Sequence, residues 1–311
     1  MVADNLPAPA DTVKLLKANR VPRVRLFDPN PGALDALRKS GISVALGVKN
    51  QDLQNLANDP NAANTWVASF MTPYTPDIVF DFVVVGNEVI PKDPASPFVG
   101  PAMQNLLNAL RTSPAFQQTA VTTAIHMETL GTSYPPSQGA FTEPAAGAMR
   151  YIAPFLSTNN FPLLLNVYPF FAYASDPVNI NLDYALFRPT APAVQDGPLT
   201  YNNLFDASVD AVYSAMDKVG GSTVRIVISE SGWPSGGQGD KTTPALAQEY
   251  NNGLIQHVVH GNGTPKRPGI ITSTYLFALF NENKKTPGLD QNFGLFYPDM
   301  NPVYPISFSF P

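Results

Sequence analysis

Short apolar runs alternate along this chain with longer stretches that repeat apolar residues at helical spacing. The runs are continuous rather than alternating, which is typical of strands buried on both faces of a parallel sheet. We predict strands at residues 24–27, 43–48, 82–85, 120–125, 163–167, 224–228 and 273–278. We predict helices at residues 11–16, 33–40, 64–71, 101–112, 144–156, 203–219 and 244–260. A strand followed by a helix, repeated many times, indicates a parallel α/β protein.

The predicted elements follow one another without a recognisable boundary. The chain of 311 residues has no Gly/Ser linker, no run of charges and no internal repeat, so we expect a single domain over residues 1–311. This length suits a (β/α)₈ barrel of about 250 residues with insertions. The seven predicted strands are one fewer than a closed eight-stranded barrel needs.

Composition excludes several classes of function. Charged residues are 14% of the chain and the net charge is −5, so a nucleic acid is not expected as partner. The absence of cysteine excludes disulfides, thiolate nucleophiles and cysteine-bound zinc. We find no apolar segment that could span a membrane, no signal peptide, and no phosphate-binding or dinucleotide-binding motif. Neutral partners such as sugars remain open.

Two glutamates follow buried strands directly. Glu88 comes after the strand at 82–85, and Glu230 comes after the strand at 224–228. The carboxyl ends of parallel strands share one edge of the sheet, where ligands bind in such folds. Hydrolysis of a sugar acetal needs two carboxyl groups, and a separation of about 5–5.5 Å gives retention of configuration. Alternatively, each glutamate caps the next helix or pairs with a surface arginine.

The segments that carry these glutamates resemble those of a known family. Gly86-Asn87-Glu88 and the Glu-Ser-Gly-Trp-Pro-Ser segment at 230–235 are similar to the two active-site segments of glycoside hydrolase family 17, the plant endo-β-1,3-glucanases and their β-1,3-1,4-glucanase relatives. Further similar segments lie at 24–28, 46–48, 166–171, 279–285 and 293–297. The resemblance covers essentially the whole chain.

The resemblance implies a (β/α)₈ barrel, a retaining mechanism and a long open groove. It implies that Glu88 is the general acid/base and that Glu230 is the nucleophile. It also places Glu282 and Lys285 near this pair, where a lysine would favour the charged form of a carboxylate. The alternative for Glu282 and Lys285 is a solvated ion pair. Arg25, inside a strand of the barrel, needs an acidic partner, and we predict Glu230.

We predict that sugar-binding residues lie beside the two glutamates. Asn87 is positioned to bond a sugar hydroxyl or the nucleophile, although a turn residue satisfying its own backbone is equally consistent with the sequence. Asn166 and the aromatic residues Tyr168, Phe171 and Phe280 are the other candidates. Aromatic rings cover the apolar faces of sugars, but most aromatic residues belong to the core.

The amino-terminal part departs from the family pattern. Family members usually begin with a strand that reads like Ile-Gly-Val-x-Tyr-Gly, whereas this chain starts at Met1-Val2-Ala3-Asp4-Asn5. The usual first strand is therefore missing, and its neighbours would be left as unpaired edges. The strand is either lost from this sequence or replaced by another segment. Residues 303–310, in which apolar residues alternate with serines, are a candidate replacement.

These observations together predict a glycoside hydrolase. We expect retaining endo-hydrolysis of β-1,3-glucosidic linkages in a cell-wall β-glucan, by a monomer that needs no metal and no cofactor. One alternative is the same chemistry on mixed β-1,3-1,4-glucan. Another is a β-glucan-binding protein without turnover, if the missing strand disables the site. The resemblance implies a protein secreted to the apoplast, cell wall or vacuole, with a role in plant defence.

Overall fold

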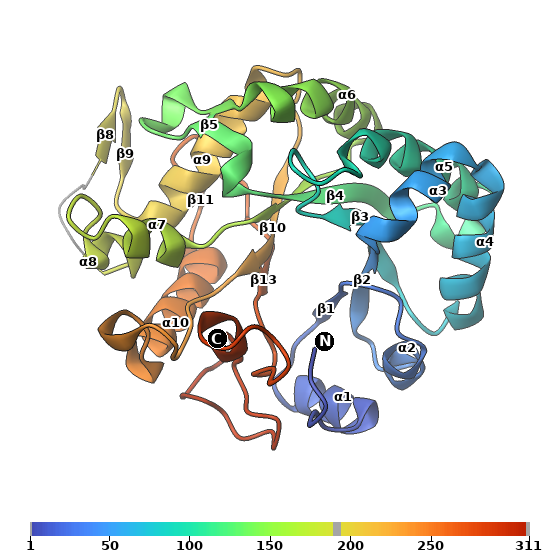
Figure 1. Cartoon of the computed structure of the whole chain (residues 1–311), viewed down its shortest axis with the longest axis horizontal. Coiled ribbons are helices and arrows are strands. Elements are labelled where there is room, and N and C mark those ends of the chain that lie inside the picture. The colour runs from blue at the N-terminus through green and yellow to red at the C-terminus, as the bar shows by residue number, and fades with distance from the viewer. Residues whose placement is uncertain (1, 189–193, 309–311) are drawn as a thin grey trace.

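Seven parallel strands form the central sheet of the computed structural model, which describes residues 2–188 and 194–308. In sheet order they are β1 (Arg23–Leu26), β2 (Ser43–Val48), β3 (Phe80–Asn87), β4 (Ala120–His126), β7 (Leu163–Asn166), β10 (Ile226–Ser231) and β13 (Thr274–Leu276). Each pairs in parallel with the next. The sheet curves into a nearly closed barrel (Figure 1). All seven strands predicted from the apolar runs are confirmed, with ends that shift by a few residues.

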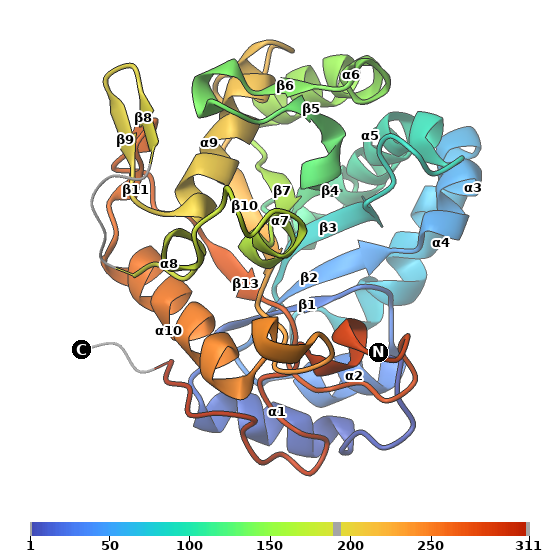
Figure 2. The ribbon, with the colours of Figure 1, turned by 60° about the vertical axis from the view of Figure 1, so that its left-hand side comes forward.

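Helices cover the outer face of this barrel (Figure 2). The helices of the described residues are α1 (Pro9–Ala18), α2 (Pro31–Leu37), α3 (Leu53–Asn58), α4 (Pro60–Phe70), α5 (Val99–Arg111), α6 (Glu143–Asn159), α7 (Pro169–Ser175), α8 (Leu182–Ala185), α9 (Leu204–Asp217) and α10 (Pro244–His260). The seven predicted helices are confirmed as α1, α2, α4, α5, α6, α9 and α10. Their starts follow from local chemistry. Thr142 and Thr243 cap α6 and α10 by accepting backbone hydrogen bonds, and each of these two helices has a proline in its first turn.

Three short antiparallel hairpins extend from the barrel. They pair β5 (Leu130–Thr132) with β6 (Ala140–Phe141), β8 (Val194–Asp196) with β9 (Leu199–Tyr201), and β11 (Gly263–Thr264) with β12 (Arg267–Pro268). These strands are two or three residues long, too short for an alternating pattern to reveal them.

The barrel interior holds a small apolar layer below a polar one. The apolar layer consists of Ala45, Val84, Ala124, Leu164, Val227 and Tyr275, one residue from each of six strands. Two residues beyond Leu164 on the same strand face comes Asn166, which pairs in register with Glu230 of β10. The polar residues therefore sit at the carboxyl ends of the strands, above a packed floor.

The sheet does not close by hydrogen bonding. Its edge strands are β1 and β13, which lie near each other, but no strand pairing joins them in the described part of the chain. Residues 303–308 do not fill this gap, because Tyr304 is buried against α10 and accepts a hydrogen bond from Asn251. The predicted replacement of the first strand by 303–310 is therefore wrong over 303–308, and residues 309 and 310 lie outside the described residues.

Candidate active site

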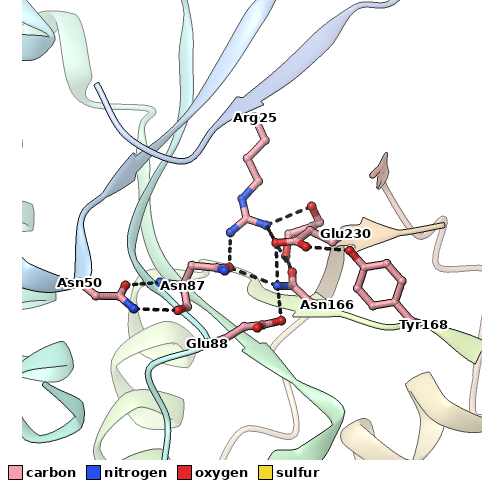
Figure 3. A network of polar contacts seen from close by, with 8 residues as sticks. Arg25, Asn50, Asn87, Glu88, Asn166, Tyr168 and Glu230 are labelled. Carbon is pink, nitrogen blue, oxygen red and sulfur yellow. Dashed lines mark hydrogen bonds and ion pairs between the residues drawn. The ribbon is translucent and has the colours of Figure 1, made fainter. Parts of the chain in front are cut away.

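Glu88 follows β3 on a backbone that leaves the regular strand. Gly86 and Glu88 both have positive φ angles, of 75° and 55°, and the Glu88 N–H donates to the carbonyl of Ala124 at 2.9 Å. A Cβ on Gly86 would lie 2.6 Å from Cγ2 of Val89, so glycine is required there by space as well as by conformation. This turn directs the Glu88 side chain toward the Asn166 amide (Figure 3).

Glu230 lies near the end of β10 and is held by three side chains. Arg25 Nη1 donates to its carboxylate at 2.8 Å, Tyr168 Oη donates at 2.7 Å, and Asn166 Nδ2 donates at 2.8 Å. The Glu230 and Arg25 side chains are only 9% and 4% exposed, so this ion pair is shielded from water. The predicted pairing of Arg25 with Glu230 is confirmed.

Asn166 brings the two glutamates together. Its Nδ2 lies 2.9 Å from Oε1 of Glu88 and 2.8 Å from Oε1 of Glu230. Two oxygens within 2.9 Å of one nitrogen are at most about 5.8 Å apart. This bound applies to the two facing Oε1 atoms, and it is compatible with the roughly 5–5.5 Å between the carboxyl groups of a retaining pair.

The electrostatics of the site centre on Glu230. Burial raises the pKa of the Glu230 carboxyl, while the Arg25 guanidinium and the Tyr168 hydroxyl lower it and offset part of that effect. The Tyr168 pKa is raised well above its usual value by burial first and then by Glu230, so this phenol stays a hydrogen-bond donor. Arg25 and Tyr168 therefore orient the Glu230 carboxylate, and Arg25 supplies the positive charge that compensates it.

Asn87 is connected to the same network. Its Oδ1 accepts from Arg25 Nη2 at 2.7 Å and lies 3.1 Å from Asn166 Nδ2. Arg25 also donates to the Ser229 carbonyl at 3.1 Å. Arg25 therefore contacts residues from β3 and β10, which carry or adjoin the two glutamates.

Aromatic rings line one flank of Glu230. Tyr168 makes edge-on contacts with Phe171, Phe277 and Phe293 at centroid distances of 5.5, 6.2 and 5.6 Å. Phe171 is 46% exposed, which leaves its ring accessible to a sugar. Phe280 is 2% exposed and packs in the core, so we assign it no contact with substrate.

Glu282 and Lys285 lie beyond this aromatic group. Lys285 Nζ is 3.3 Å from the Glu282 carboxylate and 4.4 Å from the centre of the Phe277 ring. The Val2 N–H also donates to Glu282. Within the described residues, the hydrogen bonds and ion pairs of Glu282 and Lys285 do not reach Glu88 or Glu230 directly. Lys285 is linked to Tyr168 through Phe277.

Sequence reasoning missed two polar contacts of the site. Asn50, the second residue after β2, bonds the backbone of Asn87 through both ends of its amide. Ser229 Oγ donates to Asn166 Oδ1 at 2.6 Å. The position of Asn50 at the end of a buried strand, as for Glu88 and Glu230, was a signal that could have identified it.

Two kinds of feature are absent from residues 2–188 and 194–308. No group of His, Asp or Glu side chains there has the arrangement of a metal site. No helix in the same residues combines the length and apolarity that crossing a bilayer requires.

Comparison with known proteins defines the class: the chain is a glycoside hydrolase with a TIM-barrel-like fold. More specifically, it belongs to glycosyl hydrolases family 17, whose sequence profile matches residues 1–308. The predicted family and fold class are thereby confirmed, with seven strands in the described sheet.

Individual relatives match along nearly their whole length. Lichenase-2 of Hordeum vulgare is 47% identical over 308 residues, covering 99% of this chain and 96% of the relative. A glucan endo-1,3-beta-glucosidase of Vitis vinifera is 45% identical, covering 98% and 89%. A solved structure, from work on two plant beta-glucan endohydrolases with distinct substrate specificities, superposes with a TM-score of 0.95 at 47% identity, covering 99% and 98%.

Proposed function

We propose that this protein hydrolyses β-1,3-glucosidic linkages inside a cell-wall β-glucan with retention of configuration. Glu88 protonates the departing glycosidic oxygen while Glu230 attacks the anomeric carbon, which forms a covalent glycosyl-enzyme. Glu88 then removes a proton from water as the water attacks that carbon and releases Glu230. The observation that carries this proposal is the shared amide of Asn166, which limits the separation of the two carboxyl groups.

The surrounding residues support this division of roles. A nucleophile must be ionised, and Arg25 and Tyr168 both favour the charged form of Glu230. We assign Phe171 a stacking contact with the substrate and the Asn87 amide a hydrogen bond to a sugar hydroxyl. Asn166 and Tyr168 act by orienting the carboxylates. We assign Glu282 and Lys285 to the edge of the groove, where Lys285 lies over the Phe277 ring and pairs with Glu282.

Mixed-linkage glucan is the second candidate substrate, favoured by the 47% identity to Lichenase-2. A third possibility is binding without turnover. We would measure reducing ends released from linear β-1,3-glucan and from β-1,3-1,4-glucan by the purified protein. Faster release from the linear polymer supports the first proposal, and faster release from the mixed polymer supports the second. Binding to either polymer without release would favour the non-catalytic alternative.

The roles of the glutamates are tested by replacement. Glu230→Ala should abolish turnover, a loss of about 10⁴-fold or more, because no other group can form the covalent intermediate. Glu143→Ala, which removes an 81% exposed carboxylate on α6, is the matched control and should retain full activity. Retained turnover in Glu230→Ala, with the fold intact by circular dichroism, would refute the assigned nucleophile.

We also propose that the protein acts as a monomer outside the cytoplasm, in the apoplast, cell wall or vacuole, with a role in plant defence. This rests on the family resemblance. Light scattering of the purified protein tests the monomer, and a defined dimer mass would contradict it. Immunolocalisation in tissue tests the compartment, and cytosolic labelling would contradict it.

A further inference from the structure

The side chain of Asn50 bonds both backbone groups of the residue that precedes Glu88. Asn50 opens the turn after β2, and its Oδ1 accepts from the Asn87 N–H at 2.9 Å. Its Nδ2 donates to the Asn87 carbonyl at 3.1 Å and lies 3.5 Å from Asp93 Oδ2. Figure 3 shows the two bonds to Asn87, on the side of β3 that faces β2. An amide that both accepts and donates in this way substitutes for one peptide group of a neighbouring strand.

The backbone needs this substitute because the strand pairing stops just before it. The β2–β3 register runs through Val48 and Val85 and goes no further. Gly86 and Glu88 then take positive φ angles on either side of Asn87. A non-glycine residue at positive φ is sterically disfavoured and persists where its surroundings enforce it. Asn50 enforces it by pairing the two backbone groups that the ended ladder leaves open.

We propose that Asn50 is a positioning residue for the acid/base carboxyl of Glu88. By holding the Asn87 backbone, it fixes the turn from which Glu88 reaches Asn166 Nδ2 and lies opposite Glu230. Glu230 is held by Arg25, Tyr168 and Asn166, which in the described residues reach Asn50 only through Asn87. Loss of Asn50 therefore displaces the acid/base more than the nucleophile. The inference rests on the role proposed above for Glu88.

The dependence on leaving group separates this role from a general loss of structure. An oligosaccharide leaving group needs a proton from the acid, whereas a dinitrophenolate departs without one. We would measure kcat/KM of Asn50→Ala on a laminari-oligosaccharide and on 2,4-dinitrophenyl β-laminaribioside. Since misplacement by about 1 Å can cost 10²-fold, we expect a loss of about 10- to 100-fold on the oligosaccharide. The loss on the dinitrophenyl substrate should be several-fold smaller.

Asn105, whose side-chain amide also bonds the backbone of a neighbouring segment, provides the matched control. Asn105 Nδ2 on α5 donates to the carbonyls of Leu56 and Ala57 at 2.8 and 3.0 Å, far from Glu88 in the hydrogen-bond network. Asn105→Ala should lower the melting temperature while its losses on the two substrates stay equal. If Asn50→Ala fails to fold, we would use Asn50→Asp, which keeps the acceptor for the Asn87 N–H and removes the donor to the Asn87 carbonyl. Its losses on the two substrates are compared in the same way.

Glu88→Ala, measured in parallel, separates failure of this inference from failure of the proposed function. If Glu88→Ala loses activity equally on both substrates, Glu88 is not the acid and the proposed function is wrong. If Glu88→Ala shows the leaving-group dependence and neither Asn50 variant does, Glu88 keeps its role and the positioning by Asn50 is refuted. A dependence shared by Glu88→Ala and the Asn50 variant, and absent from Asn105→Ala, supports the inference.

Discussion

At the scale of single residues, the active site depends on a buried carboxylate that has to stay charged. Glu230 is 7% exposed, and burial alone would favour its neutral form. Arg25 counteracts this with a full charge at 2.8 Å, and Tyr168 adds a hydrogen bond at 2.7 Å. The Tyr168 ring also meets the half-exposed Phe171. The same tyrosine thus tunes the nucleophile and supports a surface that a sugar can reach.

The pH profile should report this balance. Glu230 must be ionised to attack, so activity is lost as the pH falls through its raised pKa. We expect the acidic limb of kcat/KM above pH 4.5, the usual value for a glutamate. Tyr168→Phe removes a contact that lowers this pKa and should therefore move the limb to higher pH. The measurement is the initial rate on linear β-1,3-glucan across pH.

Tyr173→Phe is the control for this shift. Tyr173 is on α7, which begins directly after Tyr168, but the Tyr173 ring packs against Trp233. The acidic limb of kcat/KM for Tyr173→Phe should lie at the same pH as that of the unchanged protein. A downward shift in Tyr168→Phe, or an equal shift in both variants, would contradict the assigned role of the Tyr168 hydroxyl.

At the scale of elements, helix α9 ties two hairpins to the barrel through one buried acid. Asp210 is fully buried and accepts from Tyr201 of β9 at 3.0 Å, from the Lys266 backbone at 2.7 Å, and from Thr264 of β11. Burial raises the pKa of Asp210 to about 6, against an ordinary 3.8. The carboxyl is therefore bonded to both hairpins although burial disfavours its charged form.

This acid should make stability depend on pH. Because the folded-state pKa is raised, the contribution of Asp210 is fully present below about pH 3.8 and is lost as the pH rises through about 6. The difference is up to about 3 kcal/mol, at 1.36 kcal/mol per unit. Asp210→Asn should lack this part of the slope when urea unfolding is compared at pH 4 and pH 7. Asp35→Asn, which alters a 63% exposed side chain, should keep the slope. An unchanged slope in Asp210→Asn would contradict the prediction.

The elements themselves were largely predictable from sequence. Apolar runs, helical periodicity and first-turn prolines located the seven strands and seven of the helices, because burial on both faces of a strand and along one face of a helix leaves a regular pattern. The short helices α3, α7 and α8 were missed, since four to seven residues span fewer than two turns. The missed α7 begins directly after Tyr168 and presents Phe171.

At the scale of the whole molecule, one apolar cluster surrounds the sheet. It extends from Leu16 in α1 to Tyr304 near the end of the described chain. The five inner strands of the seven-stranded sheet contribute buried residues to it, whereas the edge strands β1 and β13 contribute only partly buried ones. Since this cluster joins helices from α1 to α10 in the described residues, we propose that the chain, residues 1–311, is one domain. The edges β1 and β13 are the places where this sheet lacks strand partners in the described residues.

A single domain should unfold in one transition. The two tryptophans report on different regions, because Trp66 is buried in α4 and Trp233 is buried after β10. In Trp66→Phe and in Trp233→Phe, fluorescence of the remaining tryptophan and far-ultraviolet circular dichroism should give one melting midpoint per variant. Different midpoints for the two probes within either variant would indicate separately unfolding parts.

The sequence alone determined the alternation of strands and helices, the family, and the position of Glu88 and Glu230 at strand ends. These properties are local, since burial, periodicity and short motifs are written in neighbouring residues. The tertiary structure decided which side chains meet: Asn166 between the two glutamates, Asn50 on the Asn87 backbone, and Phe280 in the core instead of the groove. These contacts join distant parts of the chain, and they depend on how the strands curve and stagger around the barrel, which local patterns do not specify.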